Sequence, residues 1–240
     1  FAPLWPRPAV AGRDADGDAK KQPDARRVEA DVRQTIRRVE KRLGALKGEP
    51  SEDEDEGERS GAPQVPLVRT AAEMADVEEL LGRLRAADKQ LRRIPARTGL
   101  SVELNGLLAR LSLGAGTYFA QAGQHAEALR RWALAHALQP SLSALVDPHV
   151  QEAQRHAIRR VIDEHRAASG QGGEPLLQEL LRALPAMPQT ADVRARLTRL
   201  FDRGVAGEAR RALVQELVGT GVLRSEDAGL FELAPVEEEA

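Results

Sequence analysis

The strongest constraint on the fold is an apolar repeat with helical spacing that runs almost without a break over residues 70–168. Apolar residues three and four positions apart predict amphipathic α-helices, because such positions share one face of a helix. Four helices are expected here, with stops at Pro95, Gly123 and Pro140 and a start at Pro148. No strand pattern interrupts them. The sequence therefore predicts an all-α fold whose centre is a short antiparallel helical array.

A separate amphipathic helix is expected over residues 24–47. Its apolar residues are spaced three and four apart: Val28, Val32, Ile36, Val39, Leu43 and Leu46. A narrow apolar seam of this kind is typical of helices that pack as coiled coils. Three heptads are marginally stable alone, so the seam needs a partner. The partner can be the rest of the same chain or a second copy, which leaves self-association through 24–47 open.

Several segments contain too few apolar residues to pack. Residues 1–23 carry four prolines and are expected to form an extended arm, in which Leu4 and Trp5 could anchor a neighbouring subunit. The acidic linker, 48–69, includes the run Ser51-Glu-Asp-Glu-Asp-Glu56, whose like charges repel one another. Residues 169–173 are expected to be a Gly-rich linker, and residues 235–240 an acidic tail.

Composition excludes several classes of function. The 240 residues include no cysteine, which rules out a disulfide framework, thiolate metal sites and a cysteine nucleophile. A net charge of −2 argues against binding nucleic acid by bulk attraction. No apolar run reaches the length of a membrane span. Because the chain begins at Phe1, an upstream segment that is removed or that anchors the protein to a membrane is an open expectation, and an intracellular or organellar location is favoured.

Residues 110–140 contain the pattern of a known helical repeat. Small residues at Gly116 and Ala128 would let two antiparallel helices approach closely, with larger side chains filling the space between them. The remaining pattern positions are Phe119, Leu129 and Trp132 between the helices, Gly123 at the turn, Ala135 against the next helix and Pro140 at the stop. This segment resembles a tetratricopeptide repeat. The resemblance implies that flanking helices complete a tetratricopeptide-like domain over 70–168.

In that family, the first helix of each repeat lines a concave groove that holds an extended peptide or a partner helix. The resemblance therefore implies a partner groove formed by Arg110, Leu113, Thr117, Ala120 and Gln121. Some members clamp a peptide carboxylate with Asn and Lys, but Gly114 stands at the Asn position here and no Lys is near. That ligand class is not expected. As an alternative, the chain's own helix over 24–47 covers the groove positions.

Residues 174–234 predict a module of a different kind. Helices are expected over 174–184, 190–202 and 206–219, followed by a β-hairpin around Asp227-Ala-Gly229. Three helices and a hairpin resemble a winged helix, whose third helix enters the major groove of DNA. The resemblance implies a nucleic-acid face formed by Arg210, Arg211, Gln215 and Arg224.

The charge of this winged-helix-like module argues against DNA as its partner. It holds eight arginines, no lysine and nine acidic residues, a net charge of −1. DNA-binding modules typically carry a basic stripe. Contact with protein is therefore favoured over contact with nucleic acid.

The sequence offers little for catalysis. His149, Glu152 and His156 could share one helix face, but a metal site needs a further ligand, and Glu152 with His156 is an ordinary helix-surface pair. No phosphate-binding loop or hydrolase motif is present. We expect no catalytic residue, metal or cofactor.

The leading hypothesis is a non-enzymatic scaffold or accessory subunit that docks other protein subunits. The alternative is a transcription regulator with a helical sensor domain and a DNA-binding winged helix.

Overall fold

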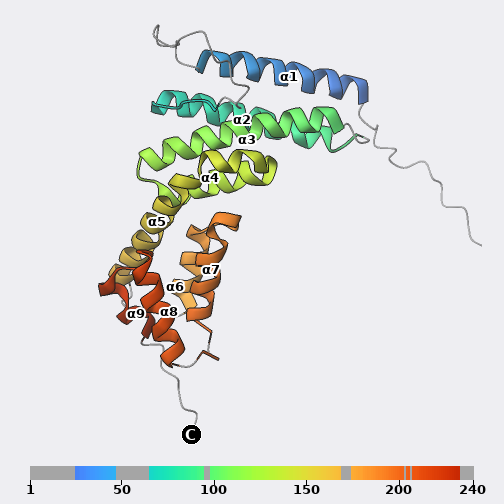
Figure 1. Ribbon diagram of the computed structural model, residues 1–240. Helices are drawn as coiled ribbons and strands as arrows, with labels where there is room; N and C mark the ends of the chain where they lie inside the picture. The colour runs from blue at the N-terminus through green and yellow to red at the C-terminus, as the bar shows by residue number, and fades with distance from the viewer. Residues whose placement is uncertain are drawn as a thin grey trace, which may run out of the picture.

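The computed structural model describes residues 25–46, 65–94, 98–168, 174–202, 204–205 and 207–232. These residues form helices joined by short connections and contain no strand, which confirms the all-α class (Figure 1). The elements are α1 (Ala25–Leu46), α2 (Ala71–Leu91), α3 (Thr98–Gln121), α4 (His125–Leu138), the 3-10 helix η1 (Pro140–Leu145), α5 (Asp147–Ala168), α6 (Glu174–Ala183), α7 (Pro188–Leu200), α8 (Gly207–Gly219), the 3-10 helix η2 (Ser225–Asp227) and α9 (Gly229–Glu232).

The first four helices form two neighbouring pairs, α1 with α2 and α3 with α4. Figure 1 shows these pairs stacked at one end of the molecule, with α5 leading diagonally to a second group made of α6 to α9. None of the described helices is long and apolar enough to cross a membrane.

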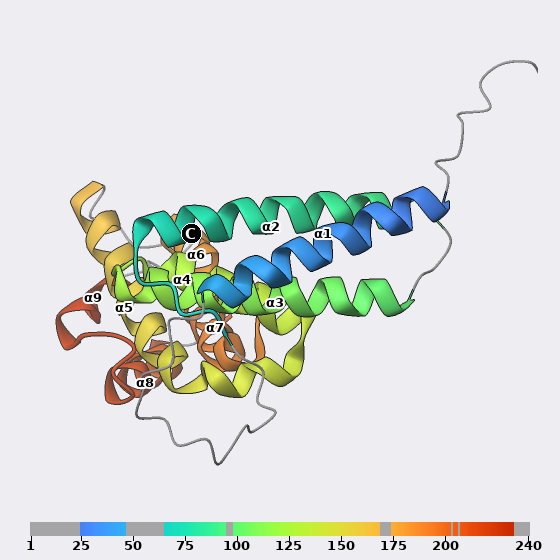
Figure 2. The ribbon, with the colours of Figure 1, turned by 90° about the horizontal axis from the view of Figure 1, so that it is seen from above.

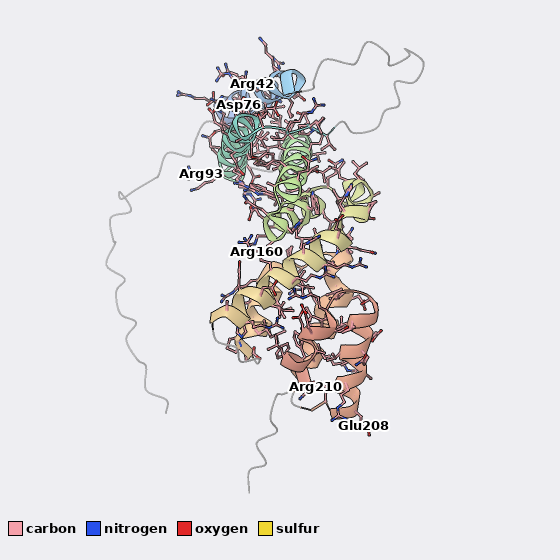
Figure 3. The ribbon with its side chains drawn as sticks, turned by 90° about the vertical axis from the view of Figure 1, so that its left-hand side faces the viewer. Arg42, Asp76, Arg93, Arg160, Glu208 and Arg210 are labelled. Atoms are coloured by element: carbon pink, nitrogen blue, oxygen red, sulfur yellow. The ribbon has the colours of Figure 1, made fainter. Side chains whose placement is uncertain are left out.

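The seam of α1 is buried by the chain itself. Seen from above, α1 lies diagonally over α2 and α3 (Figure 2). Its seam residues Val32, Ile36, Val39 and Leu43 are at most 8% exposed and share one core with α2 and α3. At the surface of this pair, Arg42 of α1 donates to Asp76 of α2 at 2.7 Å (Figure 3). The same chain therefore supplies the partner that the seam requires.

The α3–α4 pair is unusually close where small residues face each other. A Cβ added at Gly116 would lie 2.4 Å from the indole nitrogen of Trp132 and 3.2 Å from the carbonyl oxygen of Ala128. The connection between the helices turns at Gly123, whose φ of +73° is a left-handed conformation that suits glycine. Gly116 thus allows the buried Trp132 ring to lie directly against the α3 backbone.

The predicted β-hairpin is absent, and residues 222–232 fold as η2 and α9 instead. The buried Asp227 accepts hydrogen bonds from Arg224 at 2.8 Å and from Arg166 of α5 at 2.6 Å. Arg224 reaches this carboxylate from three residues before it, and Arg166 reaches it from the neighbouring helix α5. Phe231 packs edge-on against Phe201, with ring centroids 5.7 Å apart. These contacts favour compact helical turns over two extended strands, so the module lacks the wing on which its resemblance to a winged helix depends.

The end of the predicted acidic linker also differs from expectation. Residues 65–69 are extended but packed, with Pro66 and Val68 buried. A Cβ at Gly114 would lie 2.6 Å from the Pro66 carbonyl oxygen, so this segment lies directly on α3. The rest of that linker, the arm 1–23 with Leu4 and Trp5, the linker 169–173 and the tail 235–240 lie outside the described residues.

Candidate functional site

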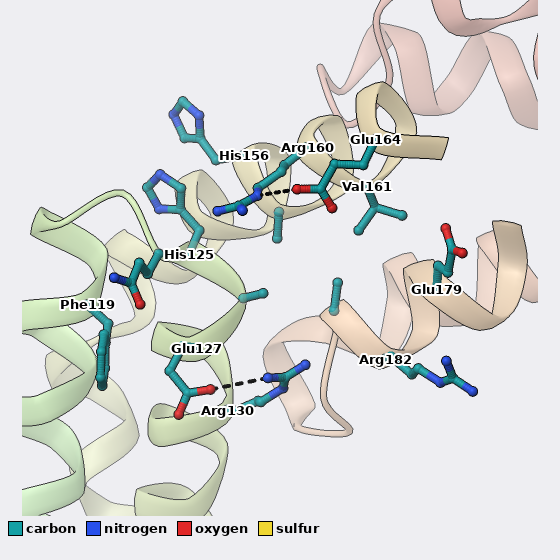
Figure 4. Close-up of a pocket in the computed structure, with 14 residues that line it drawn as sticks. Phe119, His125, Glu127, Arg130, His156, Arg160, Val161, Glu164, Glu179 and Arg182 are labelled. Carbon is teal, nitrogen blue, oxygen red and sulfur yellow. Dashed lines mark hydrogen bonds and ion pairs between the residues drawn. The ribbon is translucent and has the colours of Figure 1, made fainter. Parts of the chain in front are cut away.

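A cleft of about 800 Å³ opens between the end of α3, the start of α4, the middle of α5 and α6 (Figure 4). Its apolar surface comes from Phe119, Ala126, Ala157, Val161 and Ala183. Its polar surface comes from Gln124, His125, Glu127, Arg130, His156, Arg160, Glu164, Glu179 and Arg182. Four elements from a stretch of more than sixty residues thus build one hollow with an apolar floor and charged walls.

The spacing of residues along α5 explains how one helix serves both the core and the cleft. Val150, Ile158 and Ile162 are buried and pack in the core with α4 and α6. His156, Arg160 and Glu164 follow one another at intervals of four and line the cleft. Positions four apart form one stripe on a helix surface. Burial of Val150, Ile158 and Ile162 therefore sets the rotation of α5 about its axis, and this rotation turns His156, Arg160 and Glu164 toward the cleft.

Most charged groups of the cleft are paired within the protein. Arg160 Nε donates to Glu164 at 2.7 Å, and Glu127 accepts from Arg130 at 3.2 Å and from Arg131 at 2.8 Å. Glu179 lies 3.2 Å from His165 Nδ1. Arg182 has no carboxylate partner within the described part of the chain. The cleft therefore holds one cation that is left for a ligand.

Two histidine rings are stacked at the edge of the cleft, where α4 meets α5. The His125 and His156 centroids are 4.5 Å apart and the planes are inclined by 18°. His125 Nδ1 is buried, and no described residue forms a hydrogen bond with it. Burial lowers the pKa of His125 below 6.5, the nearby His156 and Arg160 lower it further, and Glu152 opposes them. The environment of His125 therefore favours the neutral imidazole over the protonated one.

The three residues predicted to share one face of α5 are not brought together as one cluster. His156 lies 3.9 Å from Glu152, and the third residue of that predicted face, His149, is exposed on α5. Within the described ranges, no group of three or more His, Cys, Asp and Glu side chains is arranged to hold a metal ion. On this face of α5, Glu152 and His156 thus form a surface pair, and the His156 ring also stacks on His125.

The residues of the predicted partner groove do not meet on one open surface. Leu113 is 2% exposed and belongs to the core shared with α4 and α5. Thr117 donates to the Leu113 carbonyl at 3.2 Å, while Ala120 is half-buried and Gln121 exposed. Arg110 lines a smaller pocket of about 410 Å³ with Val102 and Leu138. The segment 65–69 lies on α3 beside these positions, so the chain itself covers part of the expected groove.

The predicted nucleic-acid face is also divided. Arg210 is 7% exposed and donates to the carbonyl oxygens of Asp202 and Val205 (Figure 3). Arg224 bonds to Asp227 and Asp163, and these two hydrogen bonds raise its pKa. Arg211 and Gln215 remain exposed on α8. Two of the four side chains thus make contacts within the protein, and the other two lie exposed on α8.

Comparison with known proteins gives no family and no relative on which a function could be based. No family model, no curated protein and no solved structure matches the chain.

Proposed function

We propose that this chain is a non-enzymatic scaffold or accessory subunit that binds a segment of another protein in the cleft between α4, α5 and α6. The observation that carries the proposal is the composition of the cleft: an apolar floor surrounded by arginine–glutamate pairs. Protein interfaces combine an apolar centre with a polar, solvent-accessible rim in the same way. A segment that places an apolar side chain on the floor would exclude water from it.

The cleft is large enough to take apolar side chains of a partner segment. Its volume of about 800 Å³ lies within the range of ligand sites. Phe119 offers a ring face and Val161 a branched side chain, and they come from different helices. Arg131 lies over the Phe119 ring, 5.5 Å from its centroid, and is itself bonded to Glu78 and Glu127. The floor is therefore held in place before a partner arrives, which lowers the entropic cost of binding.

The lining residues favour binding over catalysis. No Ser, Thr, Tyr, Lys or Cys is among the residues that line the cleft, so a side-chain nucleophile of those types is not available there. Glu127, Glu164 and Glu179 each contact a basic side chain of the protein. These pairings favour a role in shaping and orienting the surface rather than in proton transfer.

Site-specific photo-crosslinking tests this proposal. A photoreactive amino acid is placed at Arg182, which lines the cleft, and in a control chain at Arg199, another exposed arginine, which lies on α7 outside the cleft. In cells that express the chain, the position in α6 should give a crosslinked protein of defined mass and the control position should not. Equal products at both positions, or none, would contradict the proposal, as would a purified chain that stays a monomer and retains no partner in light scattering.

A further inference from the structure

Positive charge is concentrated on α1, although the whole chain carries a net charge of −2. This helix of 22 residues contains seven basic and three acidic residues, a net charge of +4. The seam of α1 is buried, so nearly all of its charge lies on the outer surface of the first helix pair. Figure 3 shows nitrogen-tipped side chains around α1 at this end of the molecule.

The cations of α1 continue onto α2 across a shallow groove. Arg38 and Arg83 line this groove of about 350 Å³ with Thr35, Gln90 and two alanines. Lys41 lies one turn from Arg38, and Arg27 lies three turns before Arg38 on the same side of α1. The α1/α2 basic face is defined here as Arg27, Arg38, Lys41, Arg42 and Arg83.

Much of this charge has no internal counterpart. Arg42 is paired with Asp76, and Arg83 with Glu79. Arg27, Arg38 and Lys41 have no carboxylate within ion-pair distance in the part of the chain that the structure describes. Exposed cations without partners gain most from an anionic ligand, because binding breaks no existing ion pair.

We propose that the α1/α2 basic face docks an acidic segment of a partner polypeptide, with Asp or Glu side chains on Arg38 and Lys41. Arginine binds carboxylates with two parallel hydrogen bonds. The Gln90 amide can bond to a peptide backbone, and the Thr35 hydroxyl, which donates to the Asp31 carbonyl at 2.9 Å, can still accept a backbone N–H. Ala86 and Ala87 form a small apolar floor. The face lies on the α1–α2 pair, and the cleft at α4–α6, so this surface is distinct from the one in the proposed function.

A polypeptide fits this face better than a membrane or a nucleic acid. The apolar side of α1 is committed to the core, so it cannot insert into lipid. Exposed carboxylates lie among the cations, with Asp31 on α1 and Glu79 on α2. They would repel a continuous row of phosphates, whereas a peptide can place a backbone N–H or a basic side chain beside each of them.

Fluorescence polarisation with the full chain tests this inference. The probe is a labelled peptide of alternating Glu and Ser, compared with a Gln–Ser peptide, duplex DNA and phosphatidylserine vesicles. We expect Arg38→Glu/Lys41→Glu to weaken binding of the acidic peptide by about tenfold or more, because two attractive contacts become repulsive. The control Arg199→Glu/Arg211→Glu reverses two exposed arginines elsewhere and should change affinity by about twofold at most. Thermal unfolding verifies that each variant is folded.

Three results would overturn the inference: equal affinity in the Arg38/Lys41 variant and the wild type, equal binding of the Gln–Ser peptide, or tighter binding of DNA or vesicles than of the acidic peptide. Because the sequence contains its own acidic run at 52–56, the affinity is also measured with that run replaced by Ser and Gly. If neither the wild-type chain nor the chain with the replaced acidic run bound the acidic peptide, the inference would be overturned as well.

Discussion

The backbone of Gly116 on α3 lies against the indole of Trp132 on α4, with room for a hydrogen atom but not for a methyl group. An added Cβ would be 2.4 Å from the ring nitrogen. The ring is 1% exposed and surrounded by core residues of both helices, so it has no free space into which to move. This contact sets the separation of α3 and α4, and α4 in turn forms one wall of the cleft.

Gly116→Ala should therefore destabilise the protein by about 1–3 kcal/mol, the usual cost of overpacking a core. Gly82→Ala is a matched control, because Gly82 is also helical but its Cβ would meet no atom within 4 Å. That control should be neutral or stabilise by up to about 1 kcal/mol, since alanine is the better helix former. Urea denaturation measures the free energy of unfolding of both variants. A Gly116→Ala chain as stable as the wild type would show that α3 and α4 can move apart to accept the methyl group without cost.

The second prediction concerns the buried carboxylate of Asp227, which joins η2 to α5. Asp227→Asn removes the charge that Arg166 and Arg224 share, and leaves both guanidinium groups poorly compensated. Because these arginines are partly exposed, we expect a loss of about 1–3 kcal/mol rather than the larger cost of a fully buried pair. Asp192→Asn removes an exposed i,i+4 pair with Arg196 and should cost about 0.5 kcal/mol at most. If Asp227→Asn and Asp192→Asn lowered the denaturant midpoint equally, the proposed role of Asp227 in joining η2 to α5 would be refuted.

The third prediction concerns pH. The pKa of His125 is lowered in the folded protein, by burial first and then by His156. The unfolded chain therefore takes up a proton at this position before the folded protein does. The contribution of His125 to the free energy of unfolding should therefore fall as the pH drops from neutrality through 6.5 and level off below the folded-state pKa. The difference between wild type and His125→Gln isolates this effect from other titrating groups.

NMR titration of the imidazole protons tests the cause of this shift. His156→Gln should move the pKa of His125 toward its ordinary value without reaching it, because the burial of His125 remains. His149→Gln, a change at an exposed residue on the same helix, should leave the His125 titration unchanged. A His125 curve that is the same in the wild type and in His156→Gln would show that the stacked rings do not interact.

The helices were predictable because local signals specify them. Gly123 and Pro140 bracket α4, and α5 begins at Asp147, one residue before the proline expected to start it. The segment wrongly predicted as a β-hairpin, which folds as η2 and α9, was not predictable in the same way. Its apolar residues pack equally well from helical turns, and the contact that decides the outcome joins Asp227 to Arg166, 61 residues away. No local pattern contains that information.

The cleft was missed for a related reason. It forms where α6 packs beside α4 and α5, so its residues belong to one site only in three dimensions. The regular stripe His156–Arg160–Glu164 is the one signal in the sequence, but charged residues at intervals of four also describe an ordinary solvated face. The groove residues were placed by resemblance, and Leu113 is buried because α4 and α5 pack on that side of α3.

The measurement that tests the central claim most directly is the affinity of the partner captured at the cleft, determined with purified proteins. Arg182→Glu reverses the charge of the cleft arginine to which the described residues offer no carboxylate, and Arg199→Glu makes the same change outside the cleft. We predict that Arg182→Glu weakens binding by about tenfold, because the new carboxylate repels the acidic group that Arg182 attracts. Arg199→Glu should change the affinity by about twofold at most. Equal affinities for both variants and the wild type would contradict a partner site between α4, α5 and α6.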